Sequence, residues 1–208
     1  MSEDTPNEME HDSARHNEKM AKKKAARDKI MATKTQERGL LIVHTGKGKG
    51  KSTAAFGMIF RHVGHGMKSG VIQFVKGAWG TGERTVLEKF PELVTIKAVG
   101  EGFTWETQNR DRDVAHARAG WEEAKLLIAD PTIRCVLLDE LNIVLRYDYL
   151  PLDEVLDFLA KRPLDKHIII TGRNANERLI EMADLATEME QLKHPFRSGV
   201  KAQAGVEF

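Results

Sequence analysis

The chain has one cysteine, almost no net charge and no long apolar run, and each shortage excludes a class of protein. A single Cys135, lying in an apolar run, excludes an intramolecular disulfide. With 32 basic and 31 acidic residues, the net charge of +1 draws the whole chain neither to nucleic acid nor to a membrane surface. No apolar stretch approaches the roughly 20 residues that span a bilayer. The N-terminus has no signal-peptide pattern, so we expect a cytoplasmic protein. From the balanced charge and the lack of a membrane-spanning run, we expect no nucleic-acid or membrane partner.

The N-terminal segment, residues 1–38, has no aromatic residue and few apolar ones. Residues 1–12 are acidic and residues 13–38 are strongly basic, so the segment buries too little surface to fold alone. Residues 20–31 are nevertheless built from good helix formers. We predict a charged tail whose second half becomes helical on contact with another surface. A tail that stays fully solvated is the alternative.

From residue 39 to 208, apolar strands alternate with helical patterns, which defines a separate domain. The predicted strands cover residues 40–43, 71–75, 94–99, 135–138, 167–171 and 185–189. The predicted helices cover residues 54–60, 83–90, 111–129, 152–161 and 177–183. This alternation predicts an α/β fold, in which a mostly parallel sheet has helices on both faces. In such a sheet, ligands bind beyond the carboxyl ends of the strands.

Residues 45–53 read Thr-Gly-Lys-Gly-Lys-Gly-Lys-Ser-Thr, directly after the first strand. Glycines let backbone N–H groups crowd around phosphate oxygens, and a helix N-terminus adds positive charge. Lys51 supplies a point charge, and the Ser52 hydroxyl is a ligand for Mg²⁺. The pattern predicts a nucleoside triphosphate site on a P-loop NTPase-like (RecA-like) three-layer sandwich. Thr45 replaces the first glycine of the usual motif, and a basic hairpin tip is the alternative interpretation.

Asp139 and Glu140 end the predicted strand 135–138, at the edge where the phosphate loop should lie. A carboxylate in this place can hold a divalent cation directly or through water. Neighbouring residues of a strand point to opposite sides. We therefore expect one carboxylate to face the metal and the other to hydrogen-bond to the protein.

Two aromatic residues, Phe103 and Trp105, lie in a glycine-rich segment that follows the third strand. In an extended chain they would project to one side and form an aromatic wall. Filling a hydrophobic gap is the equally weighted alternative. Four basic residues near the predicted strand ends or the first helix could neutralise phosphate charge, or could simply be solvated: Arg61, Lys76, Arg84 and Arg173.

Taken together, these stretches resemble the ATP:corrinoid adenosyltransferases, which attach an adenosyl group to the cobalt of vitamin B12 compounds. The matching residues are 45–57, 73–77, 102–109, 138–141 with 147–151, 170–173 and 193–203. The resemblance covers essentially residues 39–208, and its most specific stretch is Gly-Phe-Thr-Trp-Glu-Thr at 102–107. Thr45 is a typical first residue of the loop in this family.

The resemblance implies that Co(I) attacks the 5′ carbon of ATP and that the whole triphosphate leaves. The residues implied to bind the nucleotide are Thr45, Gly46, Lys47, Gly48, Lys49, Gly50, Lys51, Ser52 and Thr53, together with Arg61. Lys51 would offset the triphosphate charge, and Ser52 with Glu140 would hold Mg²⁺ or Mn²⁺. Asp139 stays open as a further ligand.

Co(I) is a strong nucleophile and needs no general base, which agrees with the absence of any His/Asp or Cys/His constellation in the sequence. Positioning, exclusion of water and stabilisation of the leaving group remain for the protein. By the resemblance, Phe103 and Trp105 would pack against the corrin and exclude its lower axial ligand. Axial ligation tunes the potential of a macrocycle, so four-coordinate cobalt is easier to reduce.

The family also implies a homodimer, an N-terminal helix that covers the active site, and an electron-donating, flavodoxin-like reductase as partner. The substrate could be cobalamin, cobinamide or cobyrinic acid diamide, in synthesis or in salvage. Two other functions fit parts of the sequence. A generic phosphate-loop ATPase or kinase would need no corrinoid, and a nucleotide-gated corrinoid carrier would bind corrinoid without adenosyl transfer.

The aromatic pair generates a first prediction. Replacing Phe103 or Trp105 with Ala should impair adenosylation that starts from Co(II) more than adenosylation from chemically supplied Co(I), because the rings would act on the reduction step. Parallel assays from the two cobalt states measure this difference. Equal losses in both assays would mean that the rings only pack.

Overall fold

The computed structural model describes residues 6–75, 81–99 and 109–206, and the chain forms two compact units, Met1–Glu37 and Arg38–Phe208. The first unit contains one helix, α1 (Pro6–Ala32), whose side chains from Asp12 onward are exposed. The helix begins well before the stretch 20–31 that the sequence favoured, and its role as a cover for the active site stays a prediction. Among the described residues, no helix is long and apolar enough to cross a membrane.

The second unit is built on a six-stranded sheet with the order β3-β2-β4-β5-β1-β6. Its strands are β1 (Leu41–Thr45), β2 (Lys68–Gln73), β3 (Val94–Ala98), β4 (Ile133–Asp139), β5 (His167–Thr171) and β6 (Leu185–Glu188). Every neighbouring pair is parallel. All six predicted strands are present, so the expected α/β class is confirmed.

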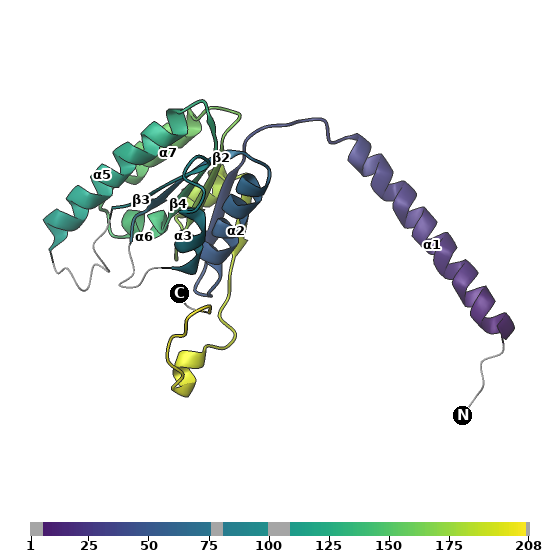
Figure 1. Ribbon diagram of the computed structural model, residues 1–208. Coiled ribbons are helices and arrows are strands. Elements are labelled where there is room, and N and C mark those ends of the chain that lie inside the picture. Colours follow the sequence, from purple (N-terminus) through teal and green to yellow (C-terminus); the bar gives the residue numbers. More distant parts are fainter. Residues whose placement is uncertain (1–5, 76–80, 100–108, 207–208) are drawn as a thin grey trace. The chain divides into compact units, whose positions relative to one another are not determined.

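Two hydrophobic cores lie on opposite faces of this sheet, because side chains along each strand alternate. In β1, Leu41 and Val43 belong to one core and Ile42 to the other. In β4, Leu138 and Leu137 divide in the same way. The helices are α2 (Lys51–Gly64), α3 (Gly82–Leu87), α5 (Arg110–Ala129), α6 (Leu141–Arg146), α7 (Leu152–Ala160) and α8 (Glu177–Met182). Helices α5 and α7 cover one face and α2 covers the other (Figure 1), which confirms the three-layer arrangement.

Helix α5 packs on the sheet through the buried residues Ala117, Trp121, Ala124 and Ile128. Trp121 is fully buried, and its ring meets Phe158 of α7 edge to face, with 5.3 Å between centroids. At Gly120 an added Cβ would lie 2.5 Å from Val99 Cγ2, so the missing side chain lets the helix approach the end of β3 closely. Both contacts direct the N-terminal half of α5 toward the carboxyl edge of the sheet.

Helix α6 lies between the predicted strand 135–138 and the predicted helix 152–161, where the sequence predicted a loop and no helix. Leu141, Val144 and Leu145 are buried against the sheet, so the chain turns into a helix directly after β4. The six-residue helix is too short for its apolar period to register in a sequence window. The prediction of a loop was therefore wrong by one helical segment, and this segment carries side chains into the site described below.

The single thiol behaves as the sequence indicated. Cys135 lies in β4 with no exposed surface, and burial raises the pKa of its thiol to about 12. The thiol is therefore protonated at neutral pH and unreactive.

A buried lysine joins α5, β4 and β5 at the opposite edge of the sheet. Lys166 is 1% exposed, and its ammonium group donates hydrogen bonds to the backbone carbonyls of Asp130 and Ile133. These carbonyls lie where the chain leaves α5 and enters β4. The lysine thus supplies hydrogen-bond donors to two carbonyl groups in the connection between α5 and β4.

Replacing Lys166 with Met should lower the free energy of unfolding by about 1–3 kcal/mol, because two buried carbonyls would lose their charged donor. Urea unfolding measures the loss. The matched control is Lys161→Met, which alters an exposed lysine close by in the sequence. A Lys166 variant as stable as the control would show that the buried ammonium contributes nothing net.

Candidate active site

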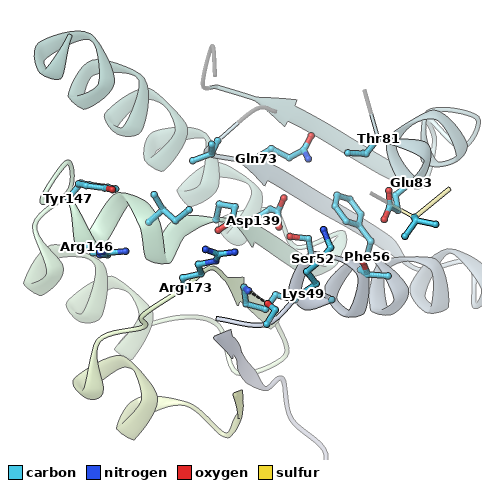
Figure 2. Close-up of a pocket in the computed structure, with 18 residues that line it drawn as sticks. Lys49, Ser52, Phe56, Gln73, Thr81, Glu83, Asp139, Arg146, Tyr147 and Arg173 are labelled. Atoms are coloured by element: carbon cyan, nitrogen blue, oxygen red, sulfur yellow. Dashed lines mark hydrogen bonds between the residues drawn. The ribbon is translucent and has the colours of Figure 1, made fainter. Parts of the chain in front are cut away.

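A cavity of about 680 Å³ opens at the carboxyl edge of the sheet. It is lined by residues from the loop after β1, the start of α2, the ends of β2 and β4, and α6 (Figure 2). The principal polar residues of the lining are Lys49, Lys51, Ser52, Gln73, Asp139, Glu140, Arg146 and Arg173. Phosphate loop and carboxylates, predicted separately from the sequence, therefore belong to one cavity.

The phosphate loop places a buried cation on the floor of this cavity. Gly50 has φ 98°, in the left-handed region that glycine tolerates, and it turns the chain directly into α2. Lys51 is 6% exposed, and its ammonium group donates a hydrogen bond of 2.5 Å to the carbonyl of Gly48. Burial lowers the pKa of Lys51, and the nearby Glu140 carboxylate opposes this shift. An anion in the cavity would supply the counter-charge that this ammonium lacks.

The absence of a side chain at Gly46 and Gly48 makes room for a neighbouring backbone segment as well as for phosphate. The Gly48 N–H donates to the carbonyl of Met189 over 2.6 Å. An added Cβ at Gly48 would lie 2.7 Å from the Glu190 carbonyl oxygen, and one at Gly46 would lie 2.4 Å from that of Met189. The C-terminal continuation of β6 therefore braces the loop, a contact between distant residues that sequence reasoning did not anticipate.

Thr45 supports the neighbouring loop. Its hydroxyl accepts a hydrogen bond of 2.9 Å from the N–H of Ala175, and its side chain is buried at the end of β1. Thr45 is not among the residues that line the cavity. The residue that first seemed out of place thus ties the phosphate loop to the segment after β5.

Thr171, at the end of β5, arranges the two carboxylates. Its hydroxyl donates to Asp139 Oδ1 over 2.7 Å and accepts from the N–H of Glu140 over 2.9 Å. Glu140 adopts φ 61° and turns the chain sharply out of β4. As expected, the two carboxylates have different surroundings: Asp139 is hydrogen-bonded to the protein, whereas Glu140 Oε2 is buried with no hydrogen-bond partner among the described residues.

Burial dominates the electrostatics of both carboxyl groups. It raises the pKa of Asp139, against hydrogen bonds from Thr171, Ser52 and Gln73 that favour the carboxylate. Burial, followed by the charge of Asp139, raises the pKa of Glu140 to about 7, whereas Lys51 and Arg173 act in the opposite direction. A divalent cation between Ser52 and Glu140 would supply the positive charge that these oxygens lack.

The structure brings two further side chains to the cavity: Arg146, which the sequence had not singled out, and Tyr147, which the sequence marked only as part of the matching stretch 147–151. Arg146 and Tyr147, at the end of α6, line the side of the cavity away from α2 (Figure 2). The Tyr147 ring stacks on Tyr149 with 5.7 Å between centroids, and the Arg146 guanidinium lies 5.6 Å from the Tyr147 centroid. Leu141, Val144 and Leu145 mark the buried face of α6, but three positions in so short a helix are too few to predict it from the sequence.

Other predicted site residues lie apart from the cavity or outside the described chain. Arg61 is exposed in the last turn of α2, about 15 Å along the helix from Lys51, and does not line the cavity. Lys47 lines a second cavity, whereas Arg173 lines both. Phe103 and Trp105 fall outside the described residues.

With this geometry in place, the comparisons with known proteins are decisive. The family model described as "ATP:corrinoid adenosyltransferase BtuR/CobO/CobP" matches residues 37–208. The chain belongs to the ATP:corrinoid adenosyltransferase family. A second model, "Cob(I)alamin adenosyltransferase N terminal", matches residues 8–31, which lie within α1.

Curated relatives of this adenosyltransferase are similar to it in sequence along nearly its whole length. The corrinoid adenosyltransferase of Sinorhizobium sp is 64% identical over 96% of this chain and 94% of its own. That of Pseudomonas aeruginosa is 53% identical over 97% of this chain and 100% of its own. The corrinoid adenosyltransferase CobA of Salmonella typhimurium is 46% identical over 93% and 98%. The predicted family and the predicted transferase activity, with ATP and a corrinoid as substrates, are confirmed.

The raised pKa of Glu140 generates a prediction for the free protein. The native state binds the proton of the Glu140 carboxyl group more tightly than the unfolded chain does. The contribution of this proton to the free energy of unfolding is therefore fully present below about pH 4.5 and is lost as pH rises through about 7. Glu140→Gln removes that loss. Its stability relative to wild type should therefore increase by roughly 2–3 kcal/mol between pH 5 and pH 8.

Urea unfolding at the two pH values, with a metal chelator and no nucleotide, measures this change. Glu83→Gln is the matched control, because it removes another carboxylate from the same cavity. A Glu140→Gln variant whose stability follows wild type in parallel across this pH range would contradict the assignment.

Proposed function

We propose that this adenosyltransferase holds the triphosphate of ATP on residues 46–53 and presents the ribose 5′ carbon to the Co(I) of a corrinoid. The observation that carries the proposal is the shared cavity, which is lined both by the buried Lys51 and by Glu140, whose Oε2 has no hydrogen-bond partner among the described residues. Such a site can bind a polyphosphate and neutralise its charge. Thr45 would position the loop. Arg61 does not line this cavity, so it would contact the nucleotide only where the nucleotide extends beyond the cavity.

The chemistry follows from the substrates. The electron pair of Co(I) forms the cobalt–carbon bond, the C5′–O bond breaks, and its electrons leave with the triphosphate. No proton is transferred in this displacement. Accordingly, the lining residues that the structure describes include no histidine or cysteine that could act as base or nucleophile.

Catalysis therefore rests on stabilising the charge of the leaving group. Lys51, held by the Gly48 carbonyl, is already in place before the reaction and needs no rearrangement. Arg173 lies close enough to act on the charges of both Lys51 and Glu140. The two cations would meet the negative charge that develops on the triphosphate when the C5′–O bond breaks.

The oxygens beside the loop fit a divalent cation, Mg²⁺ or Mn²⁺. Ser52 and Glu140 would hold it. Asp139, which accepts a hydrogen bond from Thr171, would add negative charge next to the cation. When bound, such an ion supplies charge neutralisation to the phosphate oxygens. Ser52 and Glu140 would hold the cation beside the phosphate chain, whereas Lys51 would act on the charge of the phosphates.

The remaining roles are proposed from the family resemblance. Phe103 and Trp105 would pack against the corrin, and α1 would cover the site in a homodimer. A flavodoxin-like reductase would supply the electron for Co(I) in the cytoplasm. The corrinoid would be cobalamin, cobinamide or cobyrinic acid diamide.

The phosphate product tests the proposal. Incubation with ATP, Mg²⁺ and a Co(I) corrinoid should release intact triphosphate in equal amount to the new cobalt–carbon bond. ADP and phosphate without a cobalt–carbon product would instead indicate an ordinary ATPase, and corrinoid binding without transfer would indicate a carrier.

Lys51→Ala should reduce kcat/KM for ATP by roughly 10²–10³, as expected for a lost charge-stabilising donor. Unchanged kinetics would refute the role of Lys51.

A further inference from the structure

A second cavity, of about 530 Å³, adjoins the phosphate loop. It is lined by Lys47, Arg173, Glu188, Glu190, Gln191 and Arg197. These residues come from the phosphate loop, the turn after β5, the end of β6 with its continuation, and the short 3-10 helix Pro195–Ser198. The proposed nucleotide chemistry uses Lys47 and Arg173 of this lining, but it assigns no role to Glu188, Glu190, Gln191 or Arg197.

Three cations from three separate segments meet there. Within the part of the chain that the structure describes, none of Lys47, Arg173 and Arg197 is in an ion pair, although Glu188 and Glu190 share the lining. Elsewhere in the domain arginines do pair with acids, as Arg118 of α5 does with Glu154 of α7 at 2.8 Å. Cations that share a cavity without a pairing partner retain donors for an external anion.

The second cavity and the main cavity share Arg173. Its side chain points toward the phosphate loop near Lys49, between the loop and Arg146 (Figure 2). Gly48, which lines the main cavity, is held to Met189 by a hydrogen bond, and Glu190 next to it lines the second cavity. Arg173 therefore lies between the phosphate loop and the second cavity, whereas Lys47 and Arg197 line the second cavity alone.

We propose that the second cavity is an anion subsite through which the triphosphate product leaves the phosphate loop. This inference rests on the proposed function, since it takes triphosphate as the product. A corrinoid that reaches the 5′ carbon through the main cavity would, once adenosylated, cover the triphosphate from that side. A route past Arg173 lets the anion leave independently of the larger product.

The carboxylates in the lining set how strongly the subsite binds. Three cations and two acids give a net charge of +1, so the subsite attracts a polyphosphate but holds it weakly. Weak binding suits a route of departure, because a uniformly positive cavity would retain the product and inhibit the next turnover.

Binding of sodium tripolyphosphate, measured by calorimetry with saturating ATP and Mg²⁺ and without corrinoid, tests the subsite. Wild-type protein should still bind one tripolyphosphate, and Arg197→Gln should weaken this binding about three- to tenfold. Lys201→Gln is the matched control, because it neutralises an exposed cation of the same C-terminal segment outside the cavity. If ATP abolishes tripolyphosphate binding to wild type, or if Arg197→Gln binds like the control, the subsite is refuted.

Kinetics tests the route itself. Arg197→Gln should leave the single-turnover rate of adenosyl transfer within about twofold of wild type and lower the multiple-turnover rate, because only product departure would change. Equal effects on both rates would place Arg197 in the transfer step and overturn the proposal. Failure of wild type to transfer adenosyl would refute the proposed function instead, while tripolyphosphate binding to the subsite would remain measurable.

Discussion

The parallel pairing of β1 with β5 on one side and β6 on the other is the constraint on which both cavities depend. His44 lies in register with Thr171 and Thr45 with Glu188, so the ends of all three strands meet where the phosphate loop begins. The β5 side supplies the hydroxyl that arranges the carboxylates, and the β6 side supplies the carbonyl that braces Gly48. A shift of one residue in either register would move side chains to the opposite face and dismantle the site.

The sequence predicted the strands because short, largely apolar stretches alternate with helical patterns, and it predicted the phosphate loop because Gly50, Lys51 and Ser52 are adjacent. It could not predict contacts between distant segments, such as Gly48 with Met189 or Thr45 with Ala175. A six-residue helix such as α6 carries too little periodicity, so the place of Arg146 and Tyr147 in the site was missed along with it. Local patterns thus identified the parts of the site, whereas sheet topology decided which parts meet.

Charge burial explains why the free site is electrostatically unfavourable. The cavity brings Lys51, Asp139 and Glu140 into a region where each is costly to ionise, and the carboxyl groups are raised in pKa while the ammonium is lowered. Such groups gain most from ligands of complementary charge, here a polyphosphate with its cation. The free energy spent on burying them in folding is therefore returned as binding when both ligands are present.

The backbone of Glu140 carries a last consequence. A glutamate with φ 61° occupies a region that costs a side-chain-bearing residue of the order of 1 kcal/mol, and glycine would occupy it freely. Directed evolution for thermal tolerance alone would therefore favour glycine at position 140, and in doing so would discard the carboxylate. Selection for stability and selection for turnover pull in opposite directions at this one position, so an industrial variant of this enzyme has to be screened for both.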